Sequence, residues 1–265
     1  MTRGFSAPPL PRVRWYTDED DRAARVAELA PRIPWDRFTT HYFLPNPGEH
    51  VTIVGSTGKG KTELARQILP FYPFTTLFST KKADDTVDRM IREQGYRRFE
   101  KWPNLPARDV PRRVIWPKTG KLRDMVKEQQ LVFTDALDHI YAEGGRPKQR
   151  PVGWCIAIDE IWWFTNMLKM ELELRVLWQH ARSAGISLVS ATQRAAFVPT
   201  EAFSQPTHLF FFQVRDENNL QRIGDLQAGN KRMIRDLVYN LEPFQVLYVN
   251  NVSGQMVRTR TPIPI

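Results

Sequence analysis

The stretch "HVTIVGSTGKGKTELARQILP", residues 50–70, decides the fold class of this chain. Residues 51–54 are all β-branched and predict a short buried strand, and the residues from Lys61 onward predict a helix that Pro70 ends. The glycine-rich segment that joins them, 55–62, fits the pattern G-x-x-x-x-G-K-[S/T]. In this context the backbone N–H groups point inward at the positive end of a helix, so the pattern predicts a phosphate-binding loop.

The side chains of this loop predict nucleotide and metal binding together. Lys61 is expected to reach the β- and γ-phosphates of a nucleoside triphosphate, and the hydroxyl of Thr62 is placed to coordinate Mg²⁺. We therefore expect ATP and Mg²⁺ as cofactors. The predicted phosphate-binding residues are Gly55, Ser56, Thr57, Gly58, Lys59, Gly60, Lys61 and Thr62.

A pair of carboxylates follows a second buried strand. The segment "WCIAIDE", residues 154–160, ends in Asp159 and Glu160, whose side chains point in different directions because they occupy adjacent strand-end positions. Asp159 is expected to bind Mg²⁺, and Glu160 to polarise the water that attacks the γ-phosphate. A second carboxylate beside the metal-binding one favours hydrolysis over a simple nucleotide-sensing switch.

A third strand also ends in polar residues. In "GISLVSATQRAAFVP", residues 185–199, the apolar run is followed by Thr192, Gln193 and Arg194. Ligands of open α/β sheets collect at the carboxyl ends of the strands. We therefore predict that Gln193 hydrogen-bonds the γ-phosphate or the attacking water.

Strand and helix patterns alternate along most of the chain and predict an α/β fold. We expect a mainly parallel sheet with helices on both faces and a C-terminal hairpin. At least one predicted strand lies between Gly55 and Asp159, an arrangement typical of RecA-like ATPases with an additional strand. Residues 1–45 are predicted to form an N-terminal arm and a short helical segment, and residues 46–265 a single P-loop ATPase domain. Besides those named above, the predicted elements are strands at 75–80, 112–116, 208–214, 244–250 and 255–261 and helices at 122–141 and 167–184.

Composition limits the partners and the compartment. The 265 residues carry a formal net charge of +9, which attracts polyanions and makes nucleic acid the first partner to consider. A single cysteine, Cys155, excludes a disulfide framework and a zinc-type ligand set. The sequence has no signal peptide and no apolar stretch near the ~20 residues that span a bilayer. We expect a cytoplasmic protein without a membrane segment of its own.

Three motifs in order resemble the FtsK/HerA superfamily of nucleic-acid-translocating ATPases. They are the phosphate-binding loop, "IAIDE" (156–160) and "QHARSAGISLVSATQRAAFVP" (179–199), and the resemblance covers roughly residues 48–250. It implies a RecA-like P-loop NTPase fold and a homo-oligomeric ring, hexameric or pentameric. It also implies an arginine supplied across the subunit interface, for which Arg182 fits best and Arg194 is the second choice.

Within the superfamily, the chain is most similar to minimal viral genome-packaging ATPases, because no membrane anchor, winged-helix tail or nuclease cluster follows the ATPase core. We expect translocation of double-stranded DNA in the host cytoplasm, with transient docking to a capsid portal or vertex protein. Motors for conjugation, plasmid or chromosome segregation, or filamentous phage assembly stay open as alternatives. A nucleotide-dependent regulator or kinase that does not move DNA is disfavoured by the Asp159-Glu160 and Thr192-Gln193 pairs.

Basic loops are the candidate DNA contacts, and they would touch phosphates without reading sequence. The alternative for each is a solvated surface loop that makes no DNA contact. Among aromatic residues, Trp35, Tyr42 or Phe43 could stack on adenine, whereas residues 162–164 are predicted to serve helix packing or a subunit contact. The basic loops are "STKKADD" (79–85), "PKTGKLR" (117–123) and "GGRPKQRP" (144–151).

Overall fold

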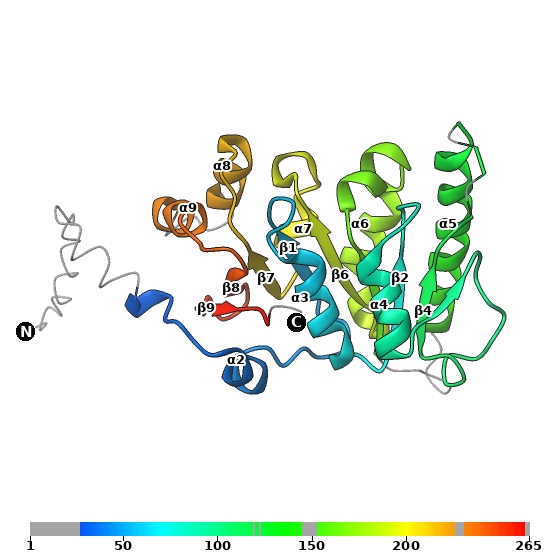
Figure 1. Cartoon of the computed structure of the whole chain (residues 1–265), viewed down its shortest axis with the longest axis horizontal. Coiled ribbons are helices and arrows are strands. Elements are labelled where there is room, and N and C mark those ends of the chain that lie inside the picture. Colours follow the sequence, from blue (N-terminus) through cyan, green and yellow to red (C-terminus); the bar gives the residue numbers. More distant parts are fainter. Residues whose placement is uncertain (1–26, 119, 122, 145–152, 226–230, 263–265) are drawn as a thin grey trace, which may run out of the picture.

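Nine strands form a single sheet in the computed structural model, which describes residues 27–118, 120–121, 123–144, 153–225 and 231–262. Their order is β3-β4-β2-β5-β6-β1-β7-β8-β9 (Figure 1). Strands β1 to β7 pair in parallel, and β8 and β9 add an antiparallel hairpin. The predicted α/β fold, with its mainly parallel sheet and C-terminal hairpin, is confirmed. The strands are β1 (Val51–Val54), β2 (Phe74–Phe78), β3 (Arg97–Phe99), β4 (Arg112–Ile115), β5 (Trp154–Ile158), β6 (Ser187–Thr192), β7 (His208–Phe211), β8 (Gln245–Asn250) and β9 (Met256–Arg260).

The strand that separates the phosphate-binding loop from the carboxylate pair is β6. It pairs with β1 on one side and β5 on the other. The sequence predicted an intervening strand from the segments between Gly55 and Asp159, but these segments, β2 and β4, lie on the far side of β5. The additional strand predicted from the sequence therefore exists, but it is β6, which follows Asp159 in the chain, and not one of the strands between Gly55 and Asp159. As a result, the carboxyl ends of β1, β6 and β5 are neighbours.

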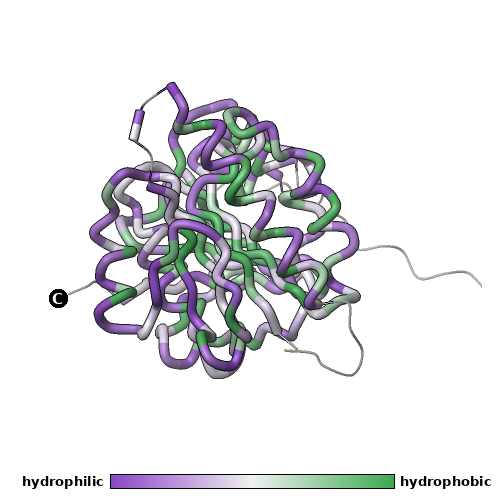
Figure 2. Tube along the Cα trace, turned by 90° about the vertical axis from the view of Figure 1, so that its right-hand side faces the viewer, coloured by the Kyte–Doolittle hydropathy of each residue, from purple (hydrophilic) through white to green (hydrophobic). Residues whose placement is uncertain are grey.

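Helices cover both faces of the sheet, as the alternation of side chains along β5 illustrates. Trp154, Ile156 and Ile158 belong to one buried cluster and Cys155 and Ala157 to the other. Helices α5 to α9 pack on the first face and α2 to α4 on the second, and hydrophobic segments gather at the centre of the molecule (Figure 2). The helices are α2 (Trp35–His41), α3 (Lys61–Ile68), α4 (Asp85–Gln94), α5 (Met125–Gly144), α6 (Glu171–His180), α7 (Glu201–Ser204), α8 (Glu217–Asp225) and α9 (Lys231–Tyr239).

The helix predicted over residues 167–184 is in fact three shorter pieces. A π-helical turn spans Trp163–Met167, α6 follows, and a 3₁₀ turn, Ala181–Ala184, leads to Gly185. Lys169 has a φ of 55°, a left-handed conformation that interrupts the first two pieces. Four helices, α4, α7, α8 and α9, and the short strand β3 were not predicted.

The chain before β1 packs on the same sheet. The predicted arm, residues 1–14, lies outside the described residues, as does most of the segment that follows it. Residues 30–33 run beside β9, where backbone bonds of 2.7 and 2.8 Å join them to Arg258. Helix α2 buries Phe38 against Phe210. The predicted domain boundary near residue 45 therefore lies within packed structure, and it stays a prediction.

Two further observations concern Cys155 and the helices. Cys155 is a buried free thiol, and burial raises its pKa well above the ordinary value. Such a thiol is a packing residue rather than a nucleophile. Among the described helices, none combines the length and apolar character that crossing a membrane requires.

Candidate active site

The phosphate-binding loop leaves the carboxyl end of β1 and enters α3, as the sequence predicts. Gly58 and Gly60 have φ values of 73° and 108°, which only glycine adopts without strain. A Cβ on Gly60 would lie 2.9 Å from the ring of Phe244, and one on Gly55 would lie 2.6 Å from the Cβ of Phe212. The loop therefore needs glycine both for its conformation and for its close packing.

Lys61 is the first residue of α3 and is only 7% exposed. Its ammonium donates a hydrogen bond of 3.1 Å to the carbonyl of Ser56. Burial lowers the pKa of Lys61, and the carboxylates of Asp159 and Glu160 oppose that shift. A buried cation at a helix N-terminus, beside a loop of inward N–H groups, can bind the oxygens of a polyphosphate.

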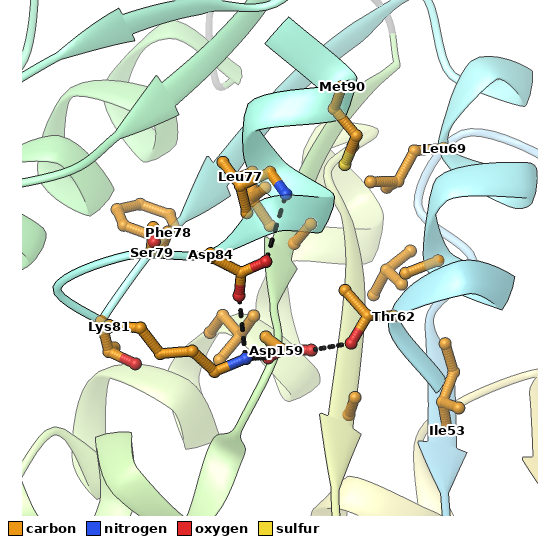
Figure 3. Close-up of a pocket in the computed structure, with 17 residues that line it drawn as sticks. Ile53, Thr62, Leu69, Leu77, Phe78, Ser79, Lys81, Asp84, Met90 and Asp159 are labelled. Atoms are coloured by element: carbon orange, nitrogen blue, oxygen red, sulfur yellow. Dashed lines mark hydrogen bonds and ion pairs between the residues drawn. The ribbon is translucent and has the colours of Figure 1, made fainter. Parts of the chain in front are cut away.

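Thr62 and Asp159 meet at the side of the sheet where the parallel strands have their carboxyl ends, which we call the carboxyl edge. The Thr62 hydroxyl donates a hydrogen bond of 3.0 Å to Oδ1 of Asp159 (Figure 3). Hydroxyl and carboxylate oxygens are ligands that Mg²⁺ accepts, and this ion usually completes its shell with waters and substrate phosphates. The described residues contain no cluster of three or more His, Cys, Asp or Glu that could enclose a cation alone. The pair fits a Mg²⁺ ion that arrives with a nucleotide.

Glu160 is held by groups at the end of β6. Its Oε1 accepts a hydrogen bond of 2.9 Å from the Thr192 hydroxyl, and its Oε2 accepts one of 3.2 Å from the backbone N–H of Gln193. Burial raises the pKa of Glu160, although these hydrogen bonds oppose the shift. An oriented carboxylate with a raised pKa is a suitable acceptor for a proton from water.

The side chain of Gln193 is exposed and contacts the tip of the phosphate-binding loop. Its Oε1 accepts a hydrogen bond of 2.5 Å from the hydroxyl of Thr57. The structure thus brings Gln193 together with the loop, and through its backbone with Glu160. The strand-end residues that the sequence singled out lie at one edge of the sheet.

The two candidate arginines lie at opposite edges of the sheet. Arg182 is exposed in the turn before β6, and its backbone is so close to Gly48 that a Cβ there would lie 2.5 Å from the Arg182 carbonyl. Arg182 and Gly48 precede β6 and β1, so they lie where the strands have their amino ends, which we call the amino edge. The phosphate-binding loop of the same chain lies at the opposite, carboxyl edge. Arg194 is at the carboxyl edge, where its guanidinium stacks on Trp162 at 4.4 Å from the ring centre. Only Arg194 belongs to the surroundings of its own Glu160.

The contact between Lys81 and Asp159 was not predicted from the sequence. The ammonium of Lys81 lies 2.7 Å from Oδ2 of Asp159 and 2.8 Å from Oδ2 of Asp84. Partial burial acts to lower the pKa of Lys81, but the two carboxylates outweigh it and raise the pKa. The lysine reaches the site because β2 pairs with β5, so the loop after β2 opens beside Asp159. The sequence predicts this loop only as a candidate DNA contact.

The other basic loops and aromatic residues have different surroundings. The described part of loop 117–123 follows β4 at the carboxyl edge, whereas residues 145–151 of the third basic loop lie outside the described residues. Phe43 is fully buried against Phe210, so it is not available to stack on adenine. Phe164 is fully buried and packs on Phe133, as the prediction of helix packing requires.

Comparison with known proteins supports this fold. Neither a family model nor a curated protein sequence matches the chain. The structure is similar to B204, the DNA-packaging ATPase of Sulfolobus turreted icosahedral virus, with a TM-score of 0.55 and 15% identity over 83% of this chain and 100% of that one. The genome-packaging NTPase B204 of Sulfolobus turreted icosahedral virus 2, in complex with AMPPCP, gives 0.54 at 15% identity with the same coverage. VirB4 of Thermoanaerobacter pseudethanolicus gives 0.58 at 11% identity over 81% and 89%. The predicted P-loop ATPase fold is confirmed by these similarities.

Proposed function

We propose that this chain hydrolyses ATP and uses the energy to translocate double-stranded DNA, packaging a viral genome into a capsid. The observation that carries the proposal is the convergence of the phosphate-binding loop, the Thr62–Asp159 pair and the Glu160–Thr192 pair at one edge of the sheet. The similarity to two B204 packaging enzymes, one of them bound to AMPPCP, supports it further.

Nucleotide binding rests on the loop and on Lys61. The loop N–H groups and the Lys61 ammonium would hold the phosphates, because both present positive charge at the start of α3. Thr62 and Asp159 would hold Mg²⁺, which when bound neutralises charge on the phosphates. The partial burial of Thr62 and Asp159 limits water access and strengthens these contacts.

Hydrolysis rests on Glu160. Thr192 and the backbone of Gln193 fix its carboxylate, so it can orient a water molecule and accept its proton as the water attacks the γ-phosphorus. Gln193 reaches Thr57 at the loop tip and can therefore contact either the γ-phosphate or that water. These groups supply a base and an orienting contact, two of the parts that this reaction requires.

Coupling to DNA rests on assembly. We propose a homo-oligomeric ring, hexameric or pentameric, in which Arg182 acts on the neighbouring subunit, because its exposed position at the amino edge keeps it away from its own loop. The net charge of +9 favours a DNA partner. Loop 79–85 and the described part of loop 117–123 lie at the carboxyl edge as candidate contacts to DNA phosphates, and binding through them should weaken steeply as salt is added. A capsid portal or vertex protein is the proposed docking partner.

The test is the rate of ATP hydrolysis with and without double-stranded DNA, with oligomer size measured in ATP. The wild-type protein should be stimulated by DNA and assemble, whereas Glu160→Gln should bind ATP and assemble but hydrolyse about 10²- to 10⁴-fold more slowly. Glu100→Gln, which removes an exposed carboxylate outside the site, is the matched control. A monomer with normal turnover that ignores DNA would refute the ring motor, and absence of ATP binding would refute the ATPase.

A second candidate is a motor of the same superfamily that serves conjugation, plasmid or chromosome segregation, or filamentous phage assembly. The similarity to VirB4, with a TM-score of 0.58, favours keeping it, since the fold fits VirB4 as well as it fits B204. Neighbouring genes distinguish the two: capsid and portal genes favour packaging, and relaxase or membrane-pore genes favour the alternative. A non-motor nucleotide-dependent regulator would show neither DNA stimulation nor ring formation.

A further inference from the structure

The carboxylate of Asp159 is shared between two partners. Thr62 donates to Oδ1 at 3.0 Å, and the ammonium of Lys81 contacts Oδ2 at 2.7 Å (Figure 3). Lys81 is therefore a cation built into the chain, at the residue that is proposed to bind Mg²⁺. A carboxylate oxygen beside an ammonium is a weaker ligand for a second cation, because the two positive charges repel each other.

Two hydrogen bonds that do not involve the Lys81 side chain hold the backbone of its loop. The carbonyl of Thr80 accepts a hydrogen bond of 2.8 Å from Gln129, and the carbonyl of Lys81 accepts one of 2.6 Å from the indole of Trp116. The side chain of Lys81 is 52% exposed. Its flexible stem can swing away from Asp159 without a change in the backbone.

Asp84 gives the ammonium a second carboxylate. Its Oδ2 lies 2.8 Å from the Lys81 nitrogen, and its Oδ1 accepts hydrogen bonds from the backbone N–H groups of Thr86 and Val87 at the start of α4. Because Asp84 is fixed as a helix cap, it can keep the ammonium when Asp159 is occupied by another cation. Lys81 thus has an alternative partner within reach.

We propose that Lys81 is a positioning residue that neutralises Asp159 in the nucleotide-free protein and yields this carboxylate to Mg²⁺ when a Mg²⁺–nucleotide complex binds. The inference rests on the proposed function and adds a residue that sets how strongly Mg²⁺ and nucleotide binding depend on each other. Without Mg²⁺, Lys81 shields the phosphates from Asp159. With Mg²⁺, that shielding is no longer needed.

The experiment measures the affinity for the fluorescent nucleotide N-methylanthraniloyl-ADP with saturating Mg²⁺ and with EDTA. The quantity compared between variants is the affinity with Mg²⁺ divided by the affinity with EDTA. In Lys81→Met, Asp159 repels the phosphates in EDTA but binds Mg²⁺ without competition, so the ratio should increase about three- to tenfold over the wild-type value. Lys81→Arg keeps the charge and should retain the wild-type ratio. Lys101→Met removes an exposed charge that makes no ion pair with any described residue, and should also leave the ratio unchanged.

The outcomes separate this inference from the proposed function. If Lys81→Met lowers the affinity equally with Mg²⁺ and with EDTA, the ratio stays constant, Lys81 contacts the nucleotide itself, and the inference is overturned while the ATPase stands. If Lys81→Arg shows the same change as Lys81→Met, the charge is not the cause, and the inference again fails. A wild-type protein that binds no nucleotide in either condition would reject the proposed function and this inference together. Circular dichroism of each variant checks that the fold is intact.

Discussion

The carboxyl edge and the amino edge of the sheet make different kinds of polar contact. At the carboxyl edge, Asp159 contacts Thr62 and Lys81, and the Lys81 side chain is half exposed. At the amino edge, His50 and His208 are buried, and their ring nitrogens bond to a backbone N–H of β6 and to the Tyr248 hydroxyl at 3.0 and 2.8 Å. Contacts between partly exposed charges are exchanged for a ligand at little cost, whereas buried polar contacts are costly to break. The carboxyl edge is thus suited to chemistry and the amino edge to stability.

Substitution of Arg182 should have the largest effect. This residue lies at the amino edge, and we propose that it acts in hydrolysis at the carboxyl edge of a neighbouring subunit. Arg182→Ala should lower the steady-state rate of ATP hydrolysis by roughly 10³-fold or more, since an arginine in trans stabilises charge in the transition state. Nucleotide affinity of the monomer should not change. Phosphate release at ring-forming protein concentrations provides the measurement.

Mixed rings provide the control for Arg182. A mixture of Arg182→Ala and Glu160→Gln subunits should regain activity, because some interfaces then pair an intact Glu160 with an intact Arg182. The same mixture made with Arg194→Ala is the matched comparison. If only the Arg194 mixture regains activity, the arginine supplied in trans comes from the carboxyl edge, and the proposed division of roles between the edges is wrong.

Phe43 tests the stabilising role of the amino edge. It is fully buried and contacts Phe38, Phe71 and Phe210. Phe43→Ala should reduce the free energy of unfolding by about 3–5 kcal/mol, because it leaves a cavity among these rings. Nucleotide affinity of the folded fraction should stay unchanged. Urea unfolding measures the loss, and Leu44→Ala, at a position 58% exposed, should cost less than about 0.5 kcal/mol.

His50 gives the amino edge a pH dependence. Burial lowers the pKa of His50 from 6.5 to about 4, so the folded protein keeps the ring neutral while the unfolded chain takes up a proton. Stability that is present above pH 6.5 should therefore fall as the pH decreases towards 4, by up to roughly 3 kcal/mol. Urea unfolding between pH 4.5 and 7.5 should show a shallower dependence in His50→Gln. Parallel curves for the two proteins would contradict the assignment.

Thr192 should give the smallest effect, since it changes the carboxyl edge without removing a charged group. Thr192→Val keeps the shape but deletes the hydrogen bond to Glu160, which raises the pKa of that carboxyl further. The acid limb of the pH–rate profile should move to higher pH, and the rate at neutral pH should fall about tenfold or less. Ser190→Ala, a buried change in the same strand, is the control. An unchanged profile in Thr192→Val would show that the hydroxyl does not tune Glu160.

The positions of the loop and of the strand-end residues can be predicted from the sequence because local patterns determine them. The glycines of the loop are required by backbone conformation, and Asp159 and Glu160 follow an apolar strand directly, so their position at a strand end can be read without tertiary information. Gln193 was placed by the same reasoning. These residues meet because β1, β6 and β5 are neighbours in the sheet.

The contact of Lys81 and the strand β3 could not be predicted from local sequence patterns, whereas two of the helices that were not predicted could have been. Lys81 reaches Asp159 only because β2 pairs with β5, and strand order is a property of the whole sheet. Strand β3 has three residues, none of them buried, so it carries no alternating pattern. Helices α4 and α9 did carry a signal, since the apolar residues of each recur at helical spacing and Asp84 caps the first.

The outer edges of the sheet bear on how copies of this chain can associate. A strand with unpaired backbone groups invites the strand of another chain and leads to continuous, aggregating sheets. Here residues 30–33 bond along β9, and the opposite edge, β3, is three residues long and presents exposed Arg97 and Arg98. Both edges therefore resist strand addition. A ring of these subunits would be joined through helices and loops, contacts that can loosen and reform with each nucleotide cycle while every sheet stays intact.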